Sequence, residues 1–237
     1  MATQFAKGGF LVVSVDYRLA PTHRFPAAVH DCYDVCKWVA SKPVRDEPVF
    51  ENLDVSRLIL AGDSAGGNLA MVMATLVRDG LGPDLKPDNN VGFSVQQLLL
   101  IYPWFLMERF VKEKFPSSLP FLPTTMIDFY FDSYVPGASI EEKRKMVETE
   151  RRLSPVLAGF HGLPRTLMVI AERDLLRFEN HLSVDLMKQS GVEVVSRAYP
   201  GQPHGFLSID KYKPADICIQ NIVNDLKDGL ANQLNTV

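Results

Sequence analysis

The chain has 237 residues, of which 46% are hydrophobic and 22% charged, a composition typical of a globular protein with one sizeable buried core. Its 25 basic and 28 acidic residues give a formal net charge of -3, so there is no basic field to bind nucleic acid or an anionic lipid surface. Cys32, Cys36 and Cys218 form neither a disulfide framework nor a zinc motif. This usage indicates a reducing compartment, by default the cytoplasm.

Two apolar stretches superficially resemble targeting or membrane segments. Gly8 to Val15 follows a lysine, but Asp16 comes next with no small-residue cleavage site, so we interpret the stretch as a buried strand. Val91 to Met107 contains polar residues and falls short of the about 18 apolar residues that a membrane span requires. We therefore expect no stable membrane span.

Five apolar runs of strand length follow one another along the chain. They are too continuously apolar for a sheet with one solvent-exposed face, so both faces should be covered. The predicted strands are Phe10–Val15, Arg57–Ala61, Phe93–Ile101, Thr166–Ala171 and Val192–Ala198.

Helical patterns separate these runs. The first begins with a proline in its first turn, and the second and third end at glycines. The predicted helices are Pro26–Ala40, Gly67–Arg78, Phe178–Ser190 and Pro214–Leu234. Strands that alternate with helices predict an α/β class, with a mostly parallel sheet and helices on both faces, in one domain over residues 1–237.

Residues 104–152 interrupt the alternation. They hold a proline-rich segment, Phe115–Pro123, then an aromatic helix around Met126–Tyr134 and a charged run, Glu141–Arg152. An insertion at a strand end is either surface decoration or a lid over the site, and both interpretations remain open.

The pentapeptide Gly62-Asp63-Ser64-Ala65-Gly66 fits the pattern G-x-S-x-G, and it lies between a predicted strand and a predicted helix. In such a nucleophile elbow, a sharp turn holds the serine in a strained conformation with its hydroxyl exposed. We expect Gly62 and Gly66 to be glycines because backbone passes close to both. The alternative is a glycine-rich turn with a satisfied serine.

A serine nucleophile requires an imidazole base, and a carboxylate that orients the imidazole. Candidates occur in the expected chain order, each after a predicted strand: Asp174, and then His204 in a Gly- and Pro-rich segment. Glu172 and Glu179 are close enough in sequence to replace Asp174 as the acid.

Several motifs together resemble the hormone-sensitive-lipase family of α/β-hydrolases, which includes bacterial esterases and arylacetamide deacetylases. They are Val15–Pro21, Phe25–Ala27, Gly62–Gly67, Tyr102–Pro103, Ser154–Pro155, Asp174 and His204–Phe206. The resemblance implies an α/β-hydrolase fold and a carboxylic ester hydrolase, acting on small-molecule esters without a metal or cofactor. It makes Ser64 the nucleophile, Asp174 the acid and His204 the base.

The chain departs from this family at its N-terminal end and therefore looks N-terminally shortened. The family carries a His-Gly-Gly-Gly motif upstream of the Asp-Tyr-Arg-Leu-Ala-Pro segment, where this chain has only Met1 to Gly9 before Phe10. The backbone amide of Ala65 is then the one oxyanion-hole donor that can be traced, and each lost donor typically costs about 3 to 4 kcal/mol. The family strand that leads to this motif would also be missing, so either the sheet closes up or the chain is incomplete.

Two classes of function follow. The first is a serine esterase that acts through an acyl-enzyme on small or medium acyl esters, with Trp104 to Tyr134 lining the acyl or alcohol pocket. The second is a catalytically impaired ligand-binding or interaction module, as in a hormone-receptor branch of the family that lost its histidine. Because His204 is present, we favour the esterase. A peptidase or thioesterase with the same machinery also remains open.

Overall fold

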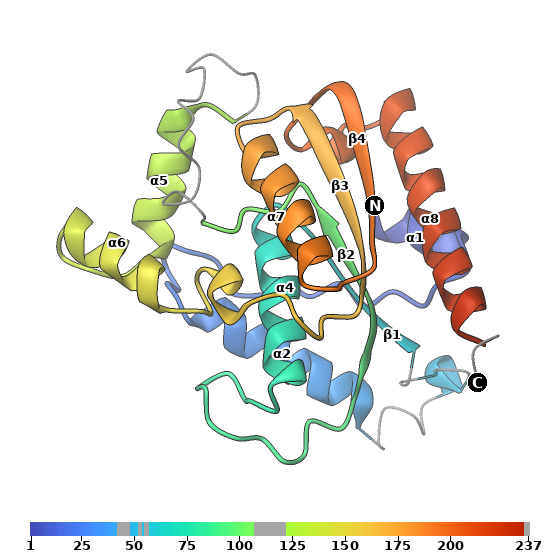
Figure 1. Cartoon of the computed structure of the whole chain (residues 1–237), viewed down its shortest axis with the longest axis horizontal. Coiled ribbons are helices and arrows are strands. Elements are labelled where there is room, and N and C mark those ends of the chain that lie inside the picture. Colours follow the sequence, from blue (N-terminus) through green and yellow to red (C-terminus); the bar gives the residue numbers. More distant parts are fainter. Residues whose placement is uncertain (42–47, 52–53, 55–56, 107–121, 235–237) are drawn as a thin grey trace.

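The computed structural model of the chain describes residues 1–41, 48–51, 54, 57–106 and 122–234. Its centre is a four-stranded, fully parallel sheet in which the strands lie in sequence order (Figure 1). The strands are β1 (Leu58–Asp63), β2 (Val95–Ile101), β3 (Arg165–Arg173) and β4 (Val194–Pro203). They confirm the last four predicted strands and the α/β class.

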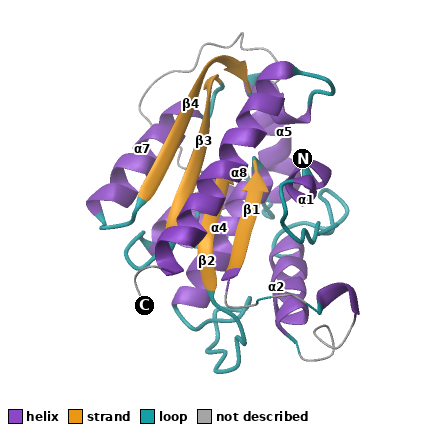
Figure 2. Ribbon diagram, turned by 90° about the vertical axis from the view of Figure 1, so that its right-hand side faces the viewer, coloured by secondary structure: helices purple, strands orange, loops and turns teal. Residues whose placement is uncertain are grey.

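Helices cover both faces of this sheet (Figure 2). On one face, Leu98 and Leu100 of β2 belong to a core with α2 (Ala27–Ala40), α4 (Ala65–Arg78) and α7 (Arg177–Gln189). On the other, Leu99 and Ile101 pack against α8 (Lys213–Leu234), beside the short α1 (Ala2–Lys7). Successive residues of a strand point to opposite faces, so the two cores explain why the strand is continuously apolar. The sequence did not predict α1.

The predicted strand Phe10–Val15 is wrong. Residues 10 to 19 have no regular secondary structure, and among the described strands β1 pairs only with β2. A strand requires a neighbour that satisfies its backbone hydrogen bonds, and none of the four described strands pairs with this segment. The segment is half exposed, with Leu11 51% and Val13 39% accessible, and β1 is itself less buried than β2 or β3.

Two further helices lie to one side of the sheet (Figure 1). They are α5 (Thr124–Tyr134) and α6 (Ile140–Thr149), in the region where an aromatic helix and a charged run were predicted. The side chain of Ser139 caps α6, and Glu142 completes the capping box. These helices share a small apolar core of Leu106, Phe131, Val135, Val147 and Leu153. Most of the predicted proline-rich segment, residues 115–121, lies outside the described residues.

Short 3-10 helices lie at Pro48–Phe50, Pro155–Ala158 and Phe206–Ser208. Within the described residues, no helix combines the length and the apolar character needed to cross a lipid bilayer.

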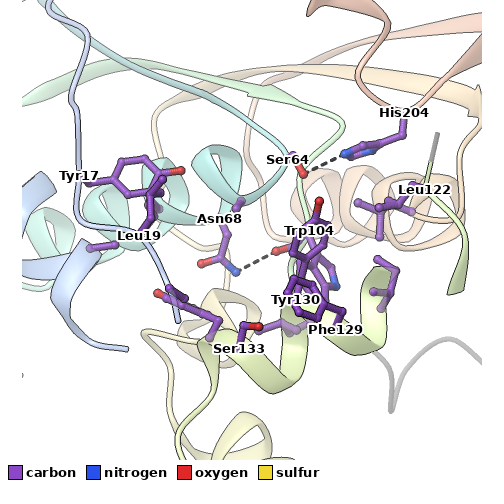
Figure 3. Close-up of a pocket in the computed structure, with 18 of the residues that line it drawn as sticks. Tyr17, Leu19, Ser64, Asn68, Trp104, Leu122, Phe129, Tyr130, Ser133 and His204 are labelled. Carbon is purple, nitrogen blue, oxygen red and sulfur yellow. Dashed lines mark hydrogen bonds between the residues drawn. The ribbon is translucent and has the colours of Figure 1, made fainter. Parts of the chain in front are cut away.

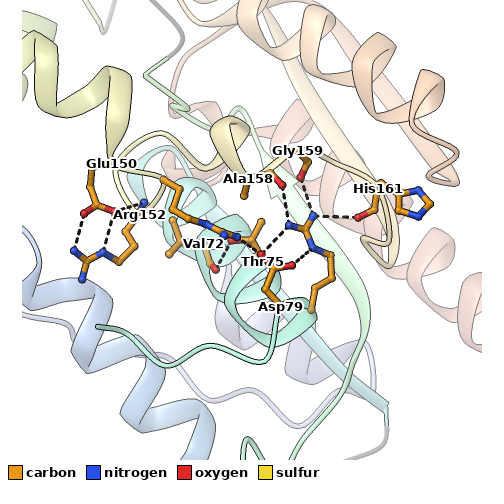
Figure 4. A network of polar contacts seen from close by, with 10 residues as sticks. Val72, Thr75, Asp79, Glu150, Arg152, Ala158, Gly159 and His161 are labelled. Carbon is orange, nitrogen blue, oxygen red and sulfur yellow. Dashed lines mark hydrogen bonds and ion pairs between the residues drawn. The ribbon is translucent and has the colours of Figure 1, made fainter. Parts of the chain in front are cut away.

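Arg78 connects the C-terminal end of α4 to the segment that leads into β3. Figure 4 shows its partners Asp79, Ala158, Gly159 and His161. Its guanidinium donates hydrogen bonds to the carbonyl oxygens of Ala158, Gly159 and His161 at 2.8, 2.8 and 3.1 Å, and to Asp79 at 2.7 Å. Arg151 contacts the same Asp79 carboxylate. One fixed cation thereby satisfies three carbonyls of a segment without long regular structure.

Candidate active site

Ser64 lies at the sharp turn between β1 and α4, and its backbone has φ 53° and ψ -119°. This left-handed conformation is unfavourable for any residue with a Cβ, so the strained turn predicted from the motif is present. The Ser64 amide donates to the carbonyl of Ile101 at 3.0 Å, which ties the turn to the end of β2. At Gly62, an added Cβ would lie 2.1 Å from the carbonyl oxygen of Gly66. Only glycine fits there.

The corresponding expectation for Gly66 is wrong. An added Cβ at Gly66 would meet nothing within 4 Å, whereas one at Gly67 would lie 2.8 Å from Cβ of Pro103. The second close approach of the elbow is therefore between α4 and the loop after β2, one residue later than the motif indicates. Gly67 is required because this loop packs directly against the first turn of the helix.

The structure brings the three predicted site residues together. The Nε2 atom of His204 lies 2.9 Å from Oγ of Ser64 (Figure 3), and its Nδ1 lies 2.6 Å from Oδ2 of Asp174. Asp174 directly follows β3 and His204 directly follows β4. Because the carboxyl ends of parallel strands meet at one edge of the sheet, residues 110 and 30 positions apart in sequence converge. Asp174 is 1% exposed, and its Oδ1 accepts a hydrogen bond from the Leu176 amide at 3.0 Å.

The two other carboxylates near Asp174 have different partners. Oε1 of Glu172 lies 2.8 Å from Nε2 of His181, at the surface. Glu179 is buried and accepts a hydrogen bond from the Phe105 amide at 2.8 Å. Of the three candidate acids, Asp174 is the one in contact with His204.

Buried polar side chains hold the loop after β2, which contacts both residues: the Trp104 amide donates to the Ser64 carbonyl, and the Tyr102 ring packs against His204. Asn180 donates to the carbonyl of Pro103 at 2.7 Å, and Asn68 donates to the carbonyl of Trp104 at 2.9 Å. With Glu179 on the Phe105 amide, side chains of α4 and α7 satisfy consecutive peptide groups of the loop. Sequence reasoning missed this role. The sequence does hold one signal for it: Glu179 and Asn180 are adjacent polar residues inside a helix whose core face is apolar.

A pocket of about 420 Å³ opens beside Ser64 (Figure 3). Ser64, Ala65 and His204 line one side of it, and most of the remaining wall is apolar or aromatic. That wall is formed by the segment before α2, the loop after β2, and α5. It includes Tyr17, Leu19, Trp104, Leu106, Leu122, Ile127, Phe129, Tyr130 and Tyr134.

Burial shifts the pKa values of ionisable groups near Ser64, among them Asp63 and Tyr17. It raises the pKa of the Asp63 carboxyl, an effect that His204 partly opposes. It also raises the pKa of the Tyr17 phenol, to which Asp63 contributes. The Tyr17 hydroxyl therefore keeps its proton at neutral pH.

A sheet of this topology, with an elbow, a histidine and a carboxylate at its carboxyl edge, defines an α/β-hydrolase. Comparison with protein families agrees: residues 2–208 match the model described as alpha/beta hydrolase fold. The chain belongs to this family, and the expected resemblance to the hormone-sensitive-lipase group is confirmed.

Several relatives of the chain are esterases. The chain is 35% identical over 206 residues to the carboxylesterase NlhH of Mycobacterium tuberculosis, covering 86% of this chain and 59% of the relative. It is 31% identical over 196 residues to the gibberellin receptor GID1B of Arabidopsis thaliana, covering 78% and 48%. A solved esterase from Pyrobaculum calidifontis superposes with a TM-score of 0.76 at 31% identity, over 96% of this chain and 69% of that one. The chain thus spans about half to two thirds of the length of these proteins.

Proposed function

We propose that the chain hydrolyses carboxylic esters with small or medium acyl groups, using Ser64 as nucleophile, His204 as base and Asp174 as the orienting acid. The observation that carries this proposal is the unbroken relay of contacts from Ser64 Oγ through the His204 ring to Asp174, at 2.9 and 2.6 Å. A serine hydroxyl is a weak nucleophile at neutral pH, and this relay supplies the base that it lacks.

The reaction has two halves. Oγ of Ser64 bonds to the ester carbonyl carbon while Nε2 of His204 takes the hydroxyl proton. When the tetrahedral intermediate collapses, the ester C–O bond breaks and the alcohol leaves with that proton. Water then attacks the acyl-enzyme, gives a proton to His204, and releases the carboxylic acid as Ser64 regains its proton. The buried Asp174 carboxylate holds the ring in one tautomer and stabilises the imidazolium in both halves.

The amide of Ala65, the first residue of α4, is the donor that we assign to the developing oxyanion. It lies at the N-terminal end of a 14-residue helix, where unpaired amides and the helix dipole favour negative charge. A donor of this kind contributes about 3 to 4 kcal/mol to stabilisation of the transition state.

We propose further that the described part of the 104–152 insertion, residues 104–106 and 122–152, forms a cap over the acyl or alcohol pocket. The described part has its own small apolar core, and Ile127, Phe129 and Tyr130 of α5 line the pocket beside the nucleophile. An insertion that lines the pocket in this way is more than surface decoration.

Turnover of p-nitrophenyl butyrate tests the proposal. Replacing Ser64 by alanine should lower kcat by at least about 10³-fold, because nothing replaces the nucleophile. The matched control is Ser190→Ala, which removes a hydroxyl at the far end of α7 from Asp174. Equal rates for wild type and Ser64→Ala would refute the assignment.

The second candidate function is ligand binding without catalysis, which the similarity to a gibberellin receptor favours. A fluorophosphonate discriminates the two, because it reacts only with an activated serine. Labelling at Ser64 that is lost in His204→Ala supports the esterase. Tight binding of an ester ligand by a wild-type protein that resists labelling supports the binding module.

A further inference from the structure

We propose that the pocket beside Ser64 selects esters whose bound portion carries a hydrogen-bond donor, either a hydroxyl or an amide N–H. Asn68 and Tyr17 accept the hydrogen bond from this donor. The inference rests on the ester hydrolysis proposed above and adds the chemical class of the substrate.

Asn68 offers a fixed acceptor. Its Nδ2 donates to the carbonyl of Trp104 at 2.9 Å and to that of Leu153 at 2.8 Å. Two carbonyl partners require both amide hydrogens, so the orientation of the side chain is determined. Oδ1 is then directed away from these carbonyls, on the Tyr17 side of the pocket (Figure 3). No donor among the described residues bonds to it.

Tyr17 lines the same pocket, with its hydroxyl end directed toward the interior (Figure 3). The neighbouring Arg18 holds its backbone in place, because Arg18 donates to the Asp31 carboxylate from its amide at 2.8 Å and its guanidinium at 2.8 Å. Within the described part of the chain, the Tyr17 hydroxyl has no hydrogen-bond partner, and the same is true of Tyr134, another lining residue. Protonated phenols both donate and accept.

Asn68 Oδ1 and the Tyr17 hydroxyl face a cavity whose other walls are largely hydrocarbon and aromatic. A purely apolar group bound there would strip water from them and return no hydrogen bond, which is unfavourable for each. Asn68 Oδ1 only accepts, so the matching group must donate. Trp104 and Tyr130 in the same wall suit a flat ring, so we commit to hydroxylated aryl-acyl esters as the test class.

The test compares p-nitrophenyl phenylacetate with its 2-, 3- and 4-hydroxyphenylacetate analogues. The wild type should prefer at least one hydroxylated isomer over the parent by about tenfold or more in kcat/KM. Tyr17→Phe, which removes only the hydroxyl, should abolish most of that ratio. Tyr33→Phe is the matched control, because its hydroxyl bonds to Asp88 and does not line the pocket. No preference for any isomer, or a preference unchanged in Tyr17→Phe, would overturn the proposal.

A binding measurement separates this inference from the hydrolysis. In a Ser64→Ala, Trp38→Phe background, Trp104 is the single tryptophan and reports occupancy of the pocket by its fluorescence. The methyl ester of the preferred isomer should bind about tenfold more tightly than methyl phenylacetate, and Tyr17→Phe should remove the difference. If the wild type hydrolyses no ester but this difference in affinity is observed, the proposed esterase activity is refuted and the proposed donor preference is supported. Equal affinities for the parent and all three isomers would refute the preference.

Discussion

The ring of Tyr102 packs against the imidazole of His204, with centroids 4.9 Å apart and planes inclined by 58°. Tyr102 is fully buried, and its amide donates to the carbonyl of Val169 at 2.8 Å, so the ring is a rigid wall. It restricts the imidazole to the orientation in which one nitrogen faces Ser64 and the other Asp174. The loop after β2 therefore positions the His204 ring as well as the elbow.

Replacing Tyr102 by leucine should lower kcat for p-nitrophenyl butyrate by about tenfold, because a side chain without a flat face leaves the imidazole freer to rotate. Tyr102→Phe keeps the ring and should retain most of the rate. Thermal unfolding curves of both variants show whether each variant is folded at the assay temperature. A Tyr102→Leu protein that is folded and hydrolyses the ester as fast as Tyr102→Phe would contradict this positioning role.

Glu179→Ala should destabilise the fold by about 2 kcal/mol, because the buried Phe105 amide loses its acceptor. Glu179→Gln retains an oxygen at the same place and should recover much of the loss. Urea unfolding followed by circular dichroism measures both. Equal free energies of unfolding for the Ala and Gln variants would show that the contact to Phe105 contributes nothing.

Arg78→Met removes the guanidinium but keeps an apolar side chain along the end of α4. Three carbonyl oxygens of the segment before β3 then lose their donor, and we expect a loss of about 2 kcal/mol in unfolding free energy. The effect should be on stability, because these contacts lie at the end of α4 opposite the elbow. A denaturation midpoint equal to that of the wild type would contradict the prediction.

The three cysteines should resist alkylation in the native protein. Burial raises the pKa of Cys32 to about 12 and those of Cys36 and Cys218 to about 11. At pH 8 a thiol with a pKa of about 11 is only about 0.1% thiolate, so iodoacetamide should react at least about 100-fold faster after unfolding in urea. Reaction should speed up as pH rises toward these pKa values. Rapid alkylation of native protein, followed by mass spectrometry, would show that a thiol is exposed.

The alternation of strands and helices was sufficient to predict where the candidate site forms. Ser64, Asp174 and His204 each follow a strand of a parallel sheet, and this topology brings strand ends to one edge. Local sequence carries that information, because apolar runs and glycine turns are short-range signals.

Features that depend on distant pairing could not be predicted. Residues 10–15 are apolar and β-branched like a strand, but a strand exists only where a neighbour accepts its hydrogen bonds. Likewise, the close approach at Gly67 depends on Pro103, which lies in the loop after β2. The hydrogen-bond partner of Glu179 depends on which backbone amide that loop leaves unpaired. Neither is visible in the local motif.

Intact-mass spectrometry of protein quenched in acid during turnover of p-nitrophenyl butyrate directly tests whether Ser64 forms an acyl-enzyme. The wild type should gain the mass of one butyryl group, located on the peptide that contains Ser64, and Ser64→Ala should gain none. An adduct on another residue, or ester hydrolysis with undiminished rate in Ser64→Ala, would contradict the central claim that Ser64, His204 and Asp174 act as one catalytic unit.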